Sequence, residues 1–354
     1  TQLLSGHLPL LLRPQSQQAL VVGLGSGMTV GAVAQHPTIQ HIDAVEISPE
    51  VVAGARYFSN WNNHIHTDPR VRLVVEDAKS FLKATAAKYD VIISEPSNPW
   101  MAGVAGVFSR EYYESCRDHL HPDGLMVQWA QLYETSDEAV NMVLGTFSSV
   151  YPFMAVWQGV LKDLILIGST RPIQVDLDKL IERFNQPAVK ADLARFDLTR
   201  VPLLLSMQVI SDQNGGFVPP DGTRVHSDFF PTLEYVAQRA FFLRKGAQQY
   251  QVFDEKYSPR SVCLLGEYAR RHPLTEDDYQ AFVLYYTQHQ LITPRLMRSI
   301  LDRWLREQPQ TTVPLEMFVQ LFTPDDATEL EILRLQSYRE LMFKRAAEKD
   351  PELL

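Results

Sequence analysis

The sequence predicts an α/β protein, with a Rossmann-like domain followed by a helical appendage. Over the first half of the chain, short apolar segments alternate with helical ones, as in a doubly wound parallel sheet. Three glycines, in VVGLGSG (21–27), lie between the first apolar segment and the first helix. From about residue 251 the pattern is helical throughout. We therefore expect a first domain over residues 1–250 and a helical appendage over residues 251–354.

Five apolar runs should form the first strands, with four helices between them. The expected strands are 19–22, 41–47, 71–76, 89–94 and 125–129, and the expected helices are 29–35, 49–60, 79–84 and 109–120. Ser48 and Pro49 signal one helix start clearly, because serine supplies an N-cap oxygen and proline fits the first helical position.

Two further strands complete the expected sheet. After a helix at 136–149, apolar runs at 153–157 and 164–168 are spaced to form an antiparallel hairpin. Seven strands with a final antiparallel pair are typical of the S-adenosylmethionine-dependent transferase fold. A dinucleotide-binding fold would have six strands and two halves, and the sequence has no second glycine loop.

The appendage should contain several amphipathic helices. Thr293-Pro294 is expected to open one of them, and Ser258-Pro259 and Thr323-Pro324 to open similar segments. The helical spacing of the first places these apolar residues on one face: Leu296, Met297, Ile300, Leu301, Trp304 and Leu305.

Composition excludes several classes of function. The formal net charge of -9 has the wrong sign for nucleic-acid binding. Two separate cysteines give no disulfide framework, and the histidines, His64 and His66 among them, lack metal-ligand spacing, so we expect no metal.

No apolar run approaches the roughly 18 residues that cross a bilayer, and no signal peptide is visible. A soluble, cytoplasmic protein is expected; because the chain begins at Thr1, without a start methionine, we also expect a fragment.

Glycines and an acid at successive strand ends indicate a nucleoside site. Gly23, Gly25 and Gly27, with Ser26 among them, allow close approach of a ligand at the carboxyl end of the first strand. A tight strand-to-helix turn is the alternative explanation for the glycines. Glu46, at the end of the second strand, can accept hydrogen bonds from both hydroxyls of a ribose.

The third and fourth strands end in further candidate residues. Asp77 could accept from an adenine amino group while the Ala78 amide meets the ring, although Asp77 could also serve only as a helix N-cap. Glu95 follows the fourth strand, and Pro96 and Pro99 fix a rigid loop there. The expected position of Glu95 at the reacting centre makes it a candidate general base.

Several motifs resemble those of the spermidine synthase (polyamine aminopropyltransferase) family. The run YDVIISEPSNP (89–99) is similar to the family signature, with Glu95 at its first acid and Asn98 replacing its second. HLPL (7–10) and Gln128 match further family positions. EPSNPWMAG (95–103) and QWAQLYE (128–134) resemble the branch fused behind membrane-spanning helices. The resemblance covers roughly residues 7–245.

The resemblance implies transfer of an aminopropyl group from decarboxylated S-adenosylmethionine to a diamine such as putrescine, releasing methylthioadenosine. Glu95 would be the base, and the diamine pocket would include Asn98, Gln128 and Tyr133. Asp228 is a weaker candidate for the pocket wall, since it could equally cap a loop. The family's amino-terminal strands, which cover the substrate, would precede Thr1.

Two other functions stay open at this point. The family usually has an aspartate where this chain has Ser26, so an enzyme acting on intact S-adenosylmethionine, as a methyltransferase or a methylthioadenosine-releasing lyase, is one alternative. A catalytically weak sensor of adenosyl ligands is another. The sequence is also compatible with attachment to membrane helices and with a homodimer.

Overall fold

The computed structural model describes residues 1–159, 162–212, 218–247, 263–289, 291, 294–309, 311, 313–314, 340 and 344. The chain divides into two compact units, one of residues 1–251 with 262–264 and the other of residues 252–261 with 265–354. None of the helices in the described ranges is long and apolar enough to cross a membrane.

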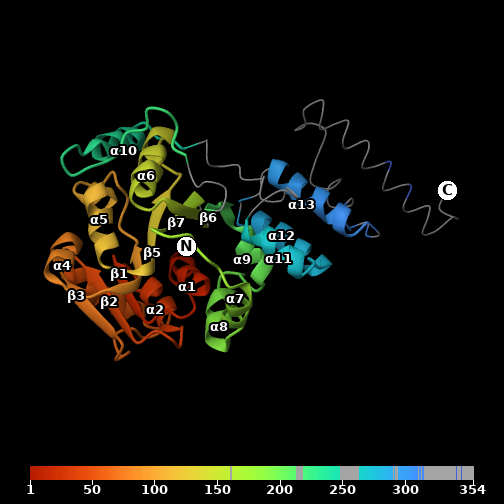
Figure 1. Cartoon of the computed structure of the whole chain (residues 1–354), viewed down its shortest axis with the longest axis horizontal. Coiled ribbons are helices and arrows are strands. Elements are labelled where there is room, and N and C mark those ends of the chain that lie inside the picture. The colour runs from red at the N-terminus through yellow and green to blue at the C-terminus, as the bar shows by residue number, and fades with distance from the viewer. Residues whose placement is uncertain are drawn as a thin grey trace. The chain divides into compact units, whose positions relative to one another are not determined.

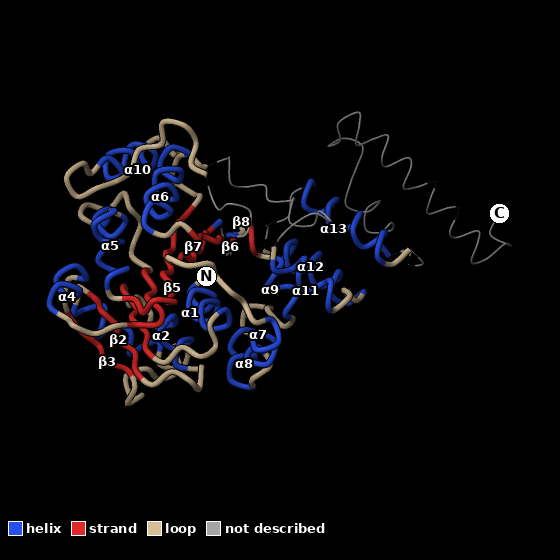
Figure 2. Tube along the Cα trace, viewed as in Figure 1, coloured by secondary structure: helices blue, strands red, loops and turns tan. Residues whose placement is uncertain are grey.

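A single mixed sheet forms the centre of the first unit (Figures 1 and 2). Its eight strands run in the order β3-β2-β1-β4-β5-β7-β6-β8. The first five are parallel to one another, and β7, β6 and β8 continue the sheet in antiparallel fashion. The strands are β1 (Gln18–Val22), β2 (His41–Glu46), β3 (Val71–Val75), β4 (Tyr89–Ser94), β5 (Leu120–Gln131), β6 (Phe153–Gln158), β7 (Asp163–Ser169) and β8 (Gln208–Ile210).

Helices pack in two groups, one on each face of this sheet (Figure 1). One group comprises α1 (Gln2–Leu12), α2 (Met28–Ala34), α7 (Leu177–Phe184) and α8 (Pro187–Ala194), and the other comprises α4 (Ala78–Ala84), α5 (Arg110–Asp118), α6 (Asp137–Val150) and α10 (Thr232–Phe242). The other helices that the structure describes in this unit are α3 (Pro49–Gly54), the 3-10 helices η1 (Ala55–Phe58) and η2 (Val104–Phe108), and α9 (Val201–Ser206).

The expected α/β, Rossmann-like fold is confirmed, but the strand count is not. The sheet has eight strands where the sequence indicated seven, because β8 is only three residues long and its apolar signal is correspondingly weak. β5 also begins five residues before the expected start at residue 125.

Helix caps explain where the elements begin, and one expected helix is shorter than predicted. Ser48 accepts a hydrogen bond from the Val51 amide at 3.2 Å, with proline at the first helical position, as the sequence indicated. The α-helix ends at Gly54, however, and a 3-10 turn follows. There the Asn62 side chain donates to the carbonyl of Ala55 and to that of Ser26, both at 2.9 Å, which ties this segment to the glycine loop.

The second unit contains three described helices, α11 (Leu264–Arg271, whose first residue belongs to the first unit), α12 (Glu276–Gln288) and α13 (Pro294–Glu307). The predicted amphipathic helix corresponds to α13, and all six residues of its expected apolar face are buried. Trp304 of α13 stacks on Tyr279 of α12 with ring centroids 5.4 Å apart. The predicted helix starts at Ser258 and Thr323 lie outside the described residues.

A buried carboxylate links three strands of the sheet. Asp43 of β2 is 1% exposed and accepts hydrogen bonds from Tyr89 Oη of β4 at 2.7 Å and from Arg72 Nε of β3 at 2.6 Å. Burial alone would raise the pKa of Asp43, but these two hydrogen bonds lower it below its ordinary value. The charged form is therefore the one that the sheet holds.

Replacing Tyr89 by phenylalanine should weaken the sheet. Tyr89→Phe leaves one buried oxygen of Asp43 without its donor, so we expect the free energy of unfolding to fall by roughly 1–3 kcal/mol. Urea unfolding monitored by circular dichroism measures the change. Tyr57→Phe is the matched control, since Tyr57 is 91% exposed. Equal midpoints for the two variants would contradict a supporting role for this hydrogen bond.

Candidate active site

The glycine loop lies at the carboxyl ends of the parallel strands. Gly23, Gly25 and Gly27 all have positive φ, at 87°, 51° and 81°, which favours glycine. A Cβ at Gly23 would collide with the backbone carbonyl oxygen of Glu95 and approach its carbonyl carbon to 3.0 Å. The loop therefore packs directly against the backbone of the residue that follows β4.

Glu46 is held beside this loop by two backbone amides. Its Oε2 accepts from the Leu24 amide at 2.9 Å, and its Oε1 accepts from the Ser48 amide at 3.0 Å. Each carboxylate oxygen has a second lone pair for a further donor. This arrangement fixes the carboxylate at the end of β2, where it could accept hydrogen bonds from two neighbouring hydroxyls.

Asp77 is the N-cap of α4, which is one of the two roles that the sequence predicted for it. Its Oδ1 accepts from the Ser80 amide at 2.9 Å, and Ala78 is the first residue of the helix. The capping bond does not exhaust the acceptors of the carboxylate. A ligand role at the end of β3 thus stays a prediction.

Gln2 and Thr29 are site residues that motif reasoning missed. Ser26 Oγ donates to Gln2 Oε1 at 3.0 Å, and Thr29 Oγ1 donates to the Gln2 carbonyl at 3.2 Å. The first turn of α1 therefore contacts the glycine loop and α2. The run that forms α1 contains Pro9 and lacks a clear capping signal, which left this helix unpredicted.

Glu95 combines partial burial with a raised pKa. The Thr29 hydroxyl donates to its Oε2, and its backbone amide donates to the Val22 carbonyl at 2.9 Å. Burial raises the pKa of Glu95 to about 7, and the nearby charge of Asp163 contributes to the rise, while the Thr29 hydrogen bond opposes it. A carboxyl group with this pKa can accept and release a proton near neutral pH.

The loop after β4 carries an amide and aromatic rings. Asn98 Nδ2 donates to Tyr133 Oη at 3.5 Å, so these two predicted substrate residues lie together. Trp100 packs edge-on against Tyr133 and stacks on Phe241, with ring centroids 6.4 and 5.0 Å apart. Phe241, in α10, is a long-range partner that the motifs did not indicate.

The other two predicted substrate-binding residues, Gln128 and Asp228, contact other parts of the protein. Gln128 is fully buried and pairs in register with Ser94, whose hydroxyl contacts Tyr112 of α5, so the register places it on the sheet face opposite α2. Asp228 forms an ion pair with Lys79 at 2.6 Å, close to the helix that Asp77 caps. Within the described part of the chain, neither side chain forms a hydrogen bond with Glu95.

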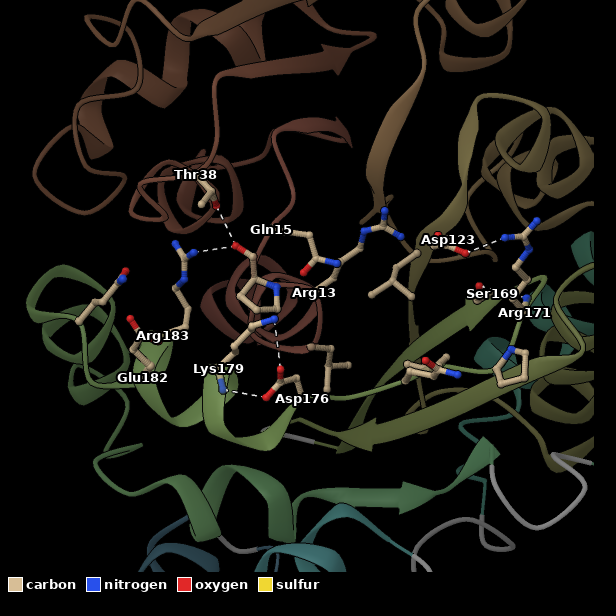
Figure 3. Close-up of a pocket in the computed structure, with 17 residues that line it drawn as sticks. Arg13, Gln15, Thr38, Asp123, Ser169, Arg171, Asp176, Lys179, Glu182 and Arg183 are labelled. Atoms are coloured by element: carbon tan, nitrogen blue, oxygen red, sulfur yellow. Dashed lines mark hydrogen bonds and ion pairs between the residues drawn. The ribbon is translucent and has the colours of Figure 1, made fainter.

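A cavity of about 880 Å³ lies on the side of the sheet where the parallel strands begin, away from the glycine loop (Figure 3). None of the predicted site residues lines this cavity. Its charged groups pair largely with one another, Arg171 with Asp123 at 3.0 Å and Lys179 with Asp176 at 3.2 Å. In open α/β sheets ligands bind outside the carboxyl ends of the parallel strands, so the glycine loop and Glu95 mark the better candidate site. Among the described residues, no group of three histidine, cysteine or acidic side chains could hold a metal ion.

Comparison with known proteins gives one consistent result. The family model described as the spermine/spermidine synthase domain matches residues 2–161. A polyamine aminopropyltransferase from Clostridium perfringens is 30% identical over 198 residues, which cover 54% of this chain and 70% of that protein. This chain belongs to the spermine/spermidine synthase family.

Two further relatives of the family share less of their length with the chain. A polyamine aminopropyltransferase from Erwinia tasmaniensis is 37% identical over 137 residues, 38% of this chain and 48% of the relative. One from Lachnoclostridium phytofermentans is 29% identical over 154 residues, 43% of this chain and 54% of the relative. The chain thus spans about half the length of these two curated relatives. The family indicated by the motifs around Glu95 is confirmed.

The contact between Gly23 and Glu95 should tolerate no side chain. Gly23→Ala adds a methyl group that collides with the Glu95 carbonyl at a positive φ, so we expect a loss of roughly 1–3 kcal/mol in the free energy of unfolding. Gly54→Ala is the control: its Cβ meets nothing within 4 Å, and in a helix it should stabilise by roughly 0.5–1 kcal/mol. Chemical denaturation distinguishes the two. A Gly23→Ala variant as stable as the parent would show that the loop and Glu95 are not tightly packed.

Proposed function

We propose that this chain transfers an aminopropyl group from decarboxylated S-adenosylmethionine to a diamine such as putrescine, releasing methylthioadenosine. The observation that carries the proposal is Glu95, a partly buried acid with a pKa of about 7, packed against the glycine loop of a spermine/spermidine synthase domain. The names of the relatives, polyamine aminopropyltransferases, support the same reaction.

The proposed reaction needs alignment and a base. The acceptor nitrogen attacks the aminopropyl carbon, the N–C bond forms as the C–S bond breaks, and the sulfur electron pair leaves with neutral methylthioadenosine. The acceptor enters largely as an ammonium and must lose a proton to attack, and Glu95 takes that proton. Positioning of the two reactants supplies most of the remaining acceleration.

The residues at the strand ends would bind the donor. Glu46 would accept from the ribose hydroxyls, and Asp77 with the Ala78 amide would meet the adenine. The loop from Gly23 to Gly27 would lie against the sulfonium side of the nucleoside. Support comes from the two amides that fix Glu46 and from the positive φ angles of the glycines.

The acceptor would bind beyond Glu95. Asn98 and Tyr133, which are in contact, would line its pocket, and the aromatic ring of Trp100 would pack on its methylene groups. Gln128 and Asp228 are weaker members of the proposed pocket, since one is buried in the sheet and the other is paired with Lys79.

We also propose how the chain divides into domains and where it works in the cell. Residues 1–250 would be the catalytic domain and residues 251–354 a helical appendage that packs or contacts a partner. The motifs at 95–103 and 128–134 favour the branch of the family attached to membrane helices, with this domain at the cytoplasmic face where the donor is made. A homodimer is compatible with these features.

Ser26 favours a second candidate function, action on intact S-adenosylmethionine. Its hydroxyl donates to Gln2, and a serine here places no negative charge against the α-carboxylate of the intact donor. A carboxylate about 4 Å from that group would disfavour it by ~1 kcal/mol in water to ~4 kcal/mol near a protein surface. Methylation of an acceptor, or elimination of methylthioadenosine, would then compete with aminopropyl transfer.

Product analysis separates these functions. Mass spectrometry after incubation with intact or decarboxylated donor, each with and without putrescine, should detect spermidine and methylthioadenosine only with the decarboxylated donor plus putrescine. Glu95→Gln should reduce that turnover by roughly 10²-fold or more, since general base catalysis contributes about this much.

Methylthioadenosine binding, measured by calorimetry, is the control for Glu95→Gln and should change little. Products from the intact donor would support the second candidate instead. Binding of the nucleoside without any product, in the parent chain, would leave only a sensor of adenosyl ligands.

A further inference from the structure

Asp163 is a buried acid on the same face of the sheet as Glu95. It opens β7 and pairs in register with Gln131 of β5, while Ser94 of β4 pairs with Gln128. Side chains alternate between the two faces of a strand. Glu95, one residue after Ser94, therefore shares its face with Gln131 and Asp163.

Three polar atoms of Asp163 and Gln131 have no hydrogen-bond partner within the described part of the chain. Asp163 is 8% exposed, and its Oδ1 has no partner of hydrogen-bond geometry among the described residues, although the Trp129 side chain lies close enough to lower its pKa. Gln131 is 4% exposed, and both polar atoms of its amide are likewise unpartnered there. Leaving a buried polar atom unpaired costs about 1–3 kcal/mol, and an unpaired buried charge costs more. A ligand that donates hydrogen bonds would remove that cost.

Electrostatic coupling places Asp163 close to both halves of the proposed acceptor pocket. Its charge raises the pKa of Glu95 and also contributes to the raised pKa of Tyr133, whose hydroxyl contacts Asn98. Burial in turn raises the pKa of Asp163 itself. Thr1, whose hydroxyl donates to Asp163, directly precedes Gln2, and the carbonyl of Gln2 accepts from the Thr29 hydroxyl that also donates to Glu95, so both acids lie against the same short segment.

The charges around this pair of acids favour a cation. Among the described residues, no lysine or arginine forms an ion pair with Glu95 or Asp163. The Thr1 hydroxyl donates a hydrogen bond to Asp163 Oδ2. The two hydroxyls of Thr1 and Thr29 occupy one oxygen of each acid, as N–H donors of an ammonium would.

We propose that Asp163 and Glu95 together bind the attacking ammonium group of the acceptor, so that Asp163 supplies the second carboxylate that Asn98 does not. This inference rests on the proposed aminopropyl transfer. Glu95 accepts the proton that the ammonium must lose, and Asp163 remains hydrogen-bonded to the nitrogen while the N–C bond forms and the C–S bond breaks. Asp163 is then a substrate-binding residue of the reaction, found on a strand that carries no family motif in this sequence.

Asp163→Asn tests the assignment, because asparagine keeps the size of the side chain and removes its charge. Losing one charge-assisted hydrogen bond to the ammonium should raise the KM for putrescine roughly 10- to 100-fold. The KM for the decarboxylated donor should stay within about twofold, since the donor contacts other strand ends. Asp118→Asn, on a side chain 66% exposed, is the matched control and should leave both values unchanged.

A binding measurement keeps this test independent of turnover. Calorimetric titration of putrescine into protein saturated with methylthioadenosine should show the same 10- to 100-fold weakening in Asp163→Asn, with an unchanged thermal midpoint or a higher one. A putrescine KM and affinity equal to those of the parent chain would overturn the role of Asp163, as would an equal rise in the donor KM. If the parent chain neither uses nor binds putrescine, both the proposed aminopropyl transfer and the role of Asp163 are wrong. If the parent chain uses and binds putrescine, the Asp163→Asn result alone decides the role of Asp163.

Discussion

The site depends on the packing of Gly23 against the backbone of Glu95. This contact joins the ends of β1 and β4, the two central parallel strands, and leaves no room for a Cβ. On the β1 side, the glycine loop contacts Glu46 through the Leu24 amide. On the β4 side, the chain continues from Glu95 into the loop that carries Asn98. A shift of either strand end would move the base and the nucleoside-binding residues apart. Close contact thus sets the geometry on which the proposed transfer depends.

The partial burial that suits Glu95 to proton transfer also weakens the fold. A carboxyl group whose pKa is about 7 in the folded chain, against 4.5 normally, binds its proton more tightly when folded. Its contribution to stability is therefore fully present below about pH 4.5 and is lost as the pH rises through 7. The shift corresponds to roughly 3 kcal/mol. The ionised form that the reaction requires is the less stable one, and a bound ammonium would offset that difference.

Residues next to strand ends could be predicted from sequence, and residues that depend on long-range pairing could not. The glycine loop, Glu46, Asp77 and Glu95 each lie at or just after the end of an apolar strand, so the parallel topology alone places them at one edge of the sheet. Asp163 pairs with Gln131, 32 positions earlier, and only the register of the antiparallel strands brings it to the face of Glu95.

Other residues were missed because their local signal is weak or their partner is distant. The helix that carries Gln2 contains a proline, β8 has three residues, and Phe241 lies more than a hundred positions from the tryptophan ring it stacks on. Gln128, by contrast, matched a family motif, yet the sheet directs it to the face away from α2. The sequence pattern indicates well where a strand ends. It does not determine which face of the sheet a given side chain of a long strand such as β5 points to.

The most direct test of the account is the titration of Glu95 itself. Carbon-13 NMR of the glutamate side-chain carboxyls, with Glu95→Gln to assign the signal, measures its pKa in the ligand-free chain and in the presence of putrescine with methylthioadenosine. We expect a pKa near 7 without ligand, and a lower value when the acceptor ammonium binds beside the carboxylate. A ligand-free pKa near 4.5 that does not respond to putrescine would contradict the assignment of Glu95 as the base of an aminopropyl transfer.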